Sequence, residues 1–221
     1  MAAHAAQGHG HDERVFHQYE DYDQQTDSYV VGMWCFVVQE IMFFGALFLV
    51  YTLYRWMYQD DFYEAHKVLN VPLGAINTTV LLTSSFSMAV AVHFAQLKKK
   101  GPQLAALGFT TICAFAFLVI KGFEWAEKFK DHHVMGPSFH WTGAGSPAHA
   151  QMFFSLYFGM TGLHAFHVII GILVIGALMY MTVKDYPQVS DYIPTEMIGL
   201  YWHFVDIVWI FLFPLFYLLP K

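Results

Sequence analysis

Five apolar stretches, each long enough to cross a lipid bilayer as a helix, dominate this chain of 221 residues. A hydrocarbon core of about 30 Å needs roughly 20 apolar residues in an α-helix. The stretches run approximately over residues 29–54, 74–97, 103–125, 151–182 and 197–219. Charged residues make up only 13% of the chain, against roughly 25% in a typical soluble domain. The sequence therefore predicts an all-α integral membrane bundle of five transmembrane helices.

The sequence divides into a polar N-terminal tail over residues 1–28 and a transmembrane domain over residues 29–221. The tail is His-rich and acidic, and it lacks the basic start and early apolar core of a cleavable signal peptide. Its histidines could bind a metal ion opportunistically and its carboxylates could collect protons, but a solvated tail is the simpler interpretation of this composition. The histidines are His4, His9, His11 and His17, and the carboxylates include Glu20, Asp21, Asp23 and Asp27.

Lysine and arginine residues indicate the orientation of the bundle, because cytoplasmic loops of membrane proteins carry an excess of both. The shortest predicted loop contains a lysine triplet at residues 98–100, followed by Gly101 and Pro102, which together predict a tight basic turn. We therefore expect a cytoplasmic N-terminus and, after an odd number of spans, a C-terminus on the outer side. The net charge of −6 gives no indication of a basic surface for nucleic acid.

Ionisable residues inside or at the ends of the predicted spans are the main candidates for function. A charged side chain at the bilayer centre costs at least about 2.5 kcal/mol on insertion scales, so each should face protein, water or lipid headgroups. We expect these positions to be intramembrane polar or lipid-linked sites, with no catalytic residue and no metal site in this chain. They are Glu40, Glu124, His164, His167, His203 and Asp206.

Each of these residues has a functional and a structural interpretation. Glu40 could relay protons, but a structural or lipid-linked carboxyl group is favoured. His164 and His167 could ligate a haem or a pair of metal ions, yet the Glu-x-x-His motif of di-iron bundles is absent from the sequence. His203 and Asp206 are three residues apart, which places them on one helix face. Their simplest interpretation is a local pair within that helix.

Hydroxyl and amide side chains crowd the second predicted span. They could line a polar pathway, but close helix packing through small residues and hydroxyl groups is the favoured interpretation. Glycines at positions 159, 162 and 171 of the fourth span support the same interpretation. The polar residues of the second span are Asn77, Thr78, Thr79, Thr83, Ser84, Ser85 and Ser87.

Five motifs, one in each predicted span, occur in a fixed order along the chain. They are QEIMFFGALF, INTTVLLTSS, KGFEWAEKF, FFSLYFGMTGLHAFHVIIG and YWHFVDIVWIFLFPLFY. In this order they resemble subunit III of the haem-copper oxidase superfamily, that is, subunit III of cytochrome c oxidases and its counterpart in quinol oxidases. The last two motifs are long and specific, and the resemblance covers residues 33–217.

The resemblance implies an accessory subunit of a respiratory terminal oxidase in its five-span form. Larger family members have two further helices that wall a lipid-filled cleft, and another subunit would have to supply that wall here. Family members carry no haem or copper and dock on subunit I, which holds these cofactors, in a complex with subunit II and other subunits. They are thought to protect subunit I from inactivation during turnover, to hold structural phospholipid and to support proton uptake. The resemblance also implies the inner (plasma) membrane of a bacterial-type cell.

The resemblance assigns positions to several of the candidate residues. Glu40 matches the family's intramembrane glutamate, which reacts with carbodiimides, and Glu124 matches an acidic position at the end of its span. The four remaining candidates match polar residues of the last two spans, namely His164, His167, His203 and Asp206. Three alternatives stay open: a quinol oxidase subunit III, the paralogous accessory subunit of nitric-oxide reductase, and a membrane redox enzyme whose own histidines bind a metal.

Overall fold

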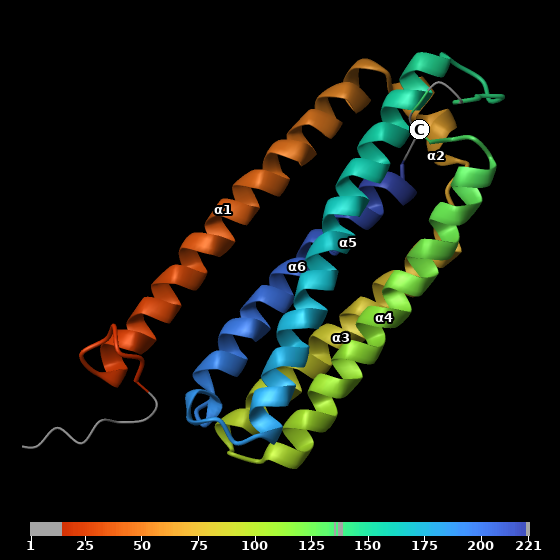
Figure 1. Ribbon diagram of the computed structural model, residues 1–221. Helices are drawn as coiled ribbons and strands as arrows, with labels where there is room; N and C mark the ends of the chain where they lie inside the picture. Colours follow the sequence, from red (N-terminus) through yellow and green to blue (C-terminus); the bar gives the residue numbers. More distant parts are fainter. Residues whose placement is uncertain (1–14, 135, 137–138, 220–221) are drawn as a thin grey trace, which may run out of the picture.

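The computed structural model describes residues 15–134, 136 and 139–219, and this part of the chain is helical without any β-strand. Five of its helices are long and apolar enough to cross a membrane (Figure 1). The prediction of an all-α bundle of five membrane-spanning helices is thereby confirmed. The five helices are α1 (Tyr22–Met57), α3 (Val71–Gln96), α4 (Lys100–Lys130), α5 (Pro147–Val183) and α6 (Ile193–Tyr217).

The first helix begins well before the predicted start of its span at residue 29. Asp21 is its N-cap, and the Asp21 carboxylate accepts a hydrogen bond from the backbone N–H of Gln24 at 2.7 Å. The last part of the predicted tail is therefore helical, while His4, His9 and His11 lie outside the described residues.

The connections also differ in detail from the prediction. The basic turn between α3 and α4 is shorter than expected, because Lys100, Gly101 and Pro102 already form the start of α4. Proline is tolerated there because the first turn of a helix has no partner for its N–H groups. A short helix, α2 (Gln59–His66), follows α1 and buries Phe62 and Ala65. A single 3₁₀ turn, η1 (Pro187–Val189), connects α5 to α6.

The core of the bundle is formed by α3, α4, α5 and α6. Helix α6 packs against α1, α3 and α5, and α4 packs against α3 and α5. Half of the residues in the apolar 18-residue stretch of α6 are buried, compared with 6% in the corresponding stretch of α1. Helix α1 is therefore a peripheral helix, and most of its apolar surface faces away from the rest of the chain.

The two ends of the bundle carry different connections (Figure 1). The start of α1, the α3–α4 turn and the α5–α6 connection lie at one end, and α2 lies at the other. The described ends of the chain lie at opposite ends of the bundle, as five membrane crossings require.

Candidate functional site

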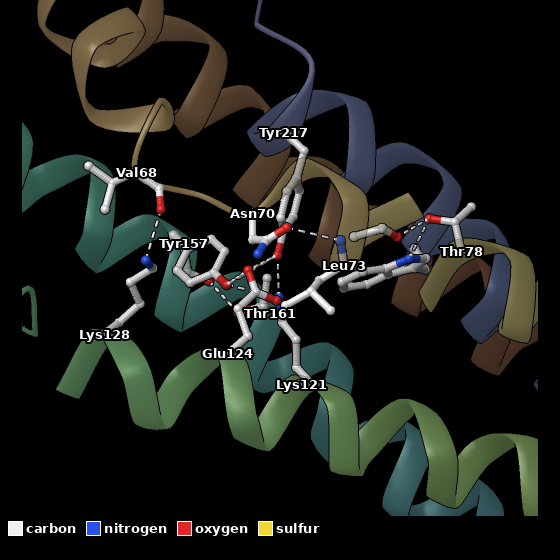
Figure 2. A network of polar contacts seen from close by, with 12 residues as sticks. Val68, Asn70, Leu73, Thr78, Lys121, Glu124, Lys128, Tyr157, Thr161 and Tyr217 are labelled. Atoms are coloured by element: carbon white, nitrogen blue, oxygen red, sulfur yellow. Dashed lines mark hydrogen bonds and ion pairs between the residues drawn. The ribbon is translucent and has the colours of Figure 1, made fainter. Parts of the chain in front are cut away.

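A buried polar cluster joins α4, α5 and α6 at the end of the bundle where α2 lies (Figure 2). The Lys121 ammonium group lies 3.1 Å from Oε2 of Glu124. It also donates hydrogen bonds to the hydroxyl oxygens of Tyr157 at 2.9 Å and Tyr217 at 2.6 Å. All four side chains belong to residues that are at most 2% exposed.

The cluster satisfies its own hydrogen-bonding groups. The hydroxyl groups of Tyr157 and Tyr217 donate to Oε1 of Glu124 at 2.9 Å and 2.6 Å. An ammonium group has three N–H donors, and Lys121 directs them to Glu124 and the two tyrosines. A buried ion pair with every donor engaged is suited to fixing helices in place, because its groups bind one another across α4, α5 and α6.

Only part of this cluster could be found from the sequence. Glu124 was a candidate, and Lys121 lies one helical turn before it in the same helix. Nothing in the sequence distinguishes Tyr157 and Tyr217 from the rest of the 13 tyrosines in the chain. One turn further along α4, Lys128 donates to the backbone carbonyl of Val68 at 2.8 Å and ties α4 to the segment between α2 and α3 (Figure 2).

A second buried contact joins the peripheral helix α1 to α5. Oε2 of Glu40 lies 3.2 Å from Nε2 of His167, and both residues are 9% exposed. Nδ1 of His167 lies 2.8 Å from the backbone carbonyl of Leu163. Because a carbonyl oxygen only accepts hydrogen bonds, Nδ1 must carry a proton. Nε2 of His167 and Oε2 of Glu40 lie within ion-pair distance, but Oε2 has no hydrogen-bond partner among the described residues.

His164 and His167 do not converge on one site. The His164 ring is fully buried between aromatic rings, with its centroid 5.4 Å from that of Phe117 and 5.1 Å from that of Trp209. Within the described part of the chain, neither ring nitrogen of His164 has a hydrogen-bond partner. Among the described residues, no group of three or more His, Cys, Asp or Glu side chains is placed to hold a metal ion.

The local pair expected between His203 and Asp206 is not formed, so that prediction is wrong. Nδ1 of His203 instead lies 2.7 Å from the hydroxyl oxygen of Ser85 in α3. Asp206 is 2% exposed, and the same Ser85 hydroxyl is a neighbour of its carboxyl group. The close packing of α3 against α6 gives His203 a partner on another helix, whereas both carboxyl oxygens of Asp206 lack a hydrogen-bond partner among the described residues.

The hydroxyl groups of α3 are used within the bundle. Those of Thr78, Thr79 and Thr83 donate to backbone carbonyls four residues earlier in α3. The indole N–H groups of Trp202 and Trp209 in α6 donate to hydroxyl groups of α3 at 3.1 Å. This arrangement favours the packing interpretation of the second span over a polar pathway.

The fold and the buried contacts define a class of protein: a multi-pass membrane bundle in which several intramembrane polar side chains contact one another across helices. Comparison with protein families then gives the family. The family model described as "Cytochrome c oxidase subunit III" matches residues 21–220. The chain therefore belongs to the cytochrome c oxidase subunit III family, the subunit III family of the haem-copper oxidases.

Several relatives are similar over nearly the whole chain. Cytochrome c oxidase subunit 3 of Thermostichus vulcanus is 29% identical over 201 residues, which cover 90% of each chain. Quinol oxidase subunit 3 of Bacillus subtilis is 30% identical over 207 residues, covering 90% of this chain and 91% of the relative. The family thus includes subunits of both cytochrome c oxidases and quinol oxidases.

A third relative is much longer than this chain. "Heme-copper oxidase subunit I+III" of Aeropyrum pernix is 31% identical over 199 residues, which cover 85% of this chain. The same match covers only 22% of the Aeropyrum protein, so the chain spans less than a quarter of that relative's length.

Proposed function

We propose that this chain is a non-catalytic subunit III that docks directly on subunit I of a proton-pumping terminal oxidase. The observation that supports this partner most directly is the Aeropyrum relative, whose name joins subunits I and III in one polypeptide. Two chains that are fused in a relative are expected to lie side by side when they are separate. Haem and copper then belong to the partner subunits, and this chain contributes packing surface and bound lipid.

The proposed role in the complex is protective. Subunit I must keep its centre intact through repeated turnover, and a bundle packed against it limits local opening towards water and lipid. In this chain, α4, α5 and α6 are tied together by the Lys121–Glu124 cluster, which gives a rigid body for such packing. Helix α1, with little buried surface of its own, is the part of the chain most available to neighbouring subunits and lipid.

We further propose the inner membrane of a bacterial-type cell, with the N-terminus in the cytoplasm. The lysine triplet at residues 98–100 then lies on the inner side, as the distribution of basic residues favours. The acidic start of α1 lies on the same side, where protons are taken up. We include in the proposal that this chain supports proton uptake from this side.

Purification of the intact complex through an affinity tag on this chain tests the proposed function. We expect subunit I and subunit II to copurify, with haem absorption bands in the complex and none in this chain after it is separated. A haem band in the separated chain would support the alternative of a redox enzyme with its own ligands. Recovery with a nitric-oxide reductase instead of an oxidase would contradict the assignment to an oxidase.

The electron donor is a separate part of the proposal. We propose cytochrome c, as in the Thermostichus relative, with quinol as the alternative favoured by the similarity to the Bacillus relative. Oxygen consumption by the purified complex with reduced cytochrome c, and in a parallel assay with a reduced quinol, distinguishes the two. Activity with the quinol alone would overturn the proposed donor without affecting the place of the chain in the complex.

A further inference from the structure

A groove of about 440 Å³ lies between α1 and α6, which begin at the same end of the bundle (Figure 1). Its lining is apolar except for one side chain, that of His203. From His203 the groove continues along α6 to Phe211, a rise of about 12 Å along a helix. A concave, mostly apolar lining with a single polar group is typical of small-molecule sites, whose volumes are about 300–1,000 Å³.

A second hollow, of about 320 Å³, meets this groove at Leu200 and His203, which line both. It lies between the end of α3 and the start of α6, and the polar side chains of His93, Gln96 and Glu196 also line it. Glu196 and His203 are seven residues apart, so they lie on one face of α6 and two turns from each other. The two hollows together form one site with an apolar part and a polar part.

The His203 ring has one nitrogen left for an occupant of this site. Its Nδ1 lies 2.7 Å from the hydroxyl oxygen of Ser85, which is the only hydrogen-bond partner of the ring among the described residues. The His203 side chain is only partly buried, and a polar group that faces lipid inside the membrane is costly unless it has a partner. When the Ser85 hydroxyl donates to Nδ1, Nε2 carries the proton and can donate to a carbonyl oxygen.

The depth of His203 in the membrane restricts the kind of occupant. His203 is ten residues after Ile193, the first residue of α6, which corresponds to a rise of about 15 Å. A lipid phosphate at this depth would lie in hydrocarbon, where a charge is costly. Among the described residues that line the two hollows there is no lysine or arginine to bind it. The polar part of the occupant is therefore small and uncharged.

We propose that the two hollows bind an isoprenoid quinone, with its ring beside His203 in the polar hollow and its tail in the groove between α1 and α6. The carbonyl oxygens of the oxidised ring accept hydrogen bonds from Nε2 of His203 and from the amide group of Gln96. The hydroxyl groups of the reduced ring can donate to the Glu196 carboxylate. The site binds the ring without transferring electrons to it. This inference goes beyond the proposed function and is independent of the electron donor of the complex.

Two glycines provide a matched pair of variants. A Cβ atom at Gly45 or at Gly176 would meet no atom within 4 Å, so a leucine at either position should leave the helix packing intact. Gly45 lines the groove, whereas Gly176 is exposed on α5 and lines neither hollow. Gly45→Leu therefore fills the tail part of the site, and Gly176→Leu is its control. His203→Phe keeps an aromatic ring but removes the hydrogen bond to the quinone.

The probe is a photoreactive azido-ubiquinone with two isoprene units, added to the intact purified complex in detergent. After illumination, peptide mass spectrometry reads the label on this chain alone, so a quinol site in another subunit does not interfere. We expect saturable labelling of the lining segments of α1, α3 and α6, which an excess of unlabelled ubiquinone abolishes.

The variants should separate the two parts of the site. Gly45→Leu should lose the labelling, and Gly176→Leu should match the unchanged complex. His203→Phe should raise the half-saturating concentration of the probe about fivefold, which is equivalent to one net hydrogen bond.

Three results would overturn the proposal. They are labelling that does not saturate, an equal half-saturating concentration in the unchanged complex and in Gly45→Leu or His203→Phe, and displacement of the probe by phosphatidylethanolamine or phosphatidylglycerol as effectively as by ubiquinone. The last result would identify the groove as a general lipid surface. The proposed function is read separately, from the subunits that copurify. Saturable labelling of this chain in a complex without subunit I would contradict the proposed docking and still support this site.

Discussion

Glu40 and His167 form the polar contact between the middle of α1 and α5, with 3.2 Å between Oε2 and Nε2. Nδ1 of His167 donates to the Leu163 carbonyl, while Nε2 lies at ion-pair distance from Oε2 of Glu40, which has no hydrogen-bond partner among the described residues. The sequence identified each residue separately, and the fold makes them a pair.

Glu40→Gln should leave assembly of the complex intact but make the oxidase lose activity faster during turnover. The glutamine amide keeps the size and polarity of the side chain beside His167, so α1 should keep its packing, while the acidic group is lost. The measurement is the decline of oxygen consumption with the number of turnovers, compared at equal subunit content. Unchanged inactivation kinetics would contradict the prediction.

Glu40→Leu is the companion variant, because it removes the polar contact with His167 as well as the acidic group. We expect it to lower the stability of the chain by about 1–3 kcal/mol, since His167 is left buried without its partner. Thermal unfolding of the purified complex should separate Glu40→Leu from Glu40→Gln. Equal melting temperatures for the two variants would show that the contact does not hold α1 in place.

Lys121→Met should be among the most destabilising single changes in the chain. It leaves the Glu124 carboxylate buried without its cation. Breaking a buried ion pair in this way lowers the free energy of unfolding by about 3–5 kcal/mol. The control is Lys130→Met near the end of the same helix, where the side chain is exposed and the expected change is within about 0.5 kcal/mol. Unfolding in a detergent titration measures both, and similar values for the two variants would argue against a structural role of the cluster.

The sequence predicted the number and type of the helices because the bilayer itself imposes their length and hydrophobicity. It could not predict which helices are neighbours, since apolar stretches without periodicity give no direction to a side chain. The partners of Glu40, Glu124 and His203 all depend on that information. His203 illustrates the limit: the nearest charged residue in the same helix is Asp206, but the actual partner is Ser85 in another helix.

Features at the ends of the spans were also missed, for a different reason. Hydropathy marks where a helix enters the hydrocarbon, whereas the helix itself continues until a cap ends it. Helix α1 therefore begins at Tyr22, after the Asp21 cap, and α4 continues beyond Trp125 as far as Lys130. The buried Lys128 lies in that continuation.

Gly171→Ala should destabilise the bundle by about 1–3 kcal/mol through overpacking. A Cβ atom at this position would lie 2.5 Å from Cζ3 of Trp202, whose ring is fully buried and cannot move aside easily. Gly176→Ala in the same helix is the control, because a Cβ atom there meets nothing within 4 Å. In thermal unfolding, the melting temperature of Gly176→Ala should equal or exceed that of the unchanged chain. If Gly176→Ala lost as much stability as Gly171→Ala, the packing argument would be contradicted.

The loop between α4 and α5 should release from the bundle on acidification. The ring of His133 stacks on that of Phe154, with centroids 5.2 Å apart, and this burial lowers the pKa of His133 below its ordinary value. A histidine whose pKa is lower in the docked state binds fewer protons there, so its contribution to docking is complete above about pH 6.5 and declines as the pH falls below that value.

Hydrogen exchange of residues 131–134 and 139–146, measured across this pH range, checks the prediction. His133→Phe keeps an aromatic ring against Phe154 but cannot take up a proton, so its protection should stay constant while that of the unchanged loop falls with pH. His140→Gln is the control, because His140 is exposed in the same loop and its loss should preserve the pH dependence. Protection that rises on acidification, or that disappears equally in His133→Phe, would show that another group controls the loop.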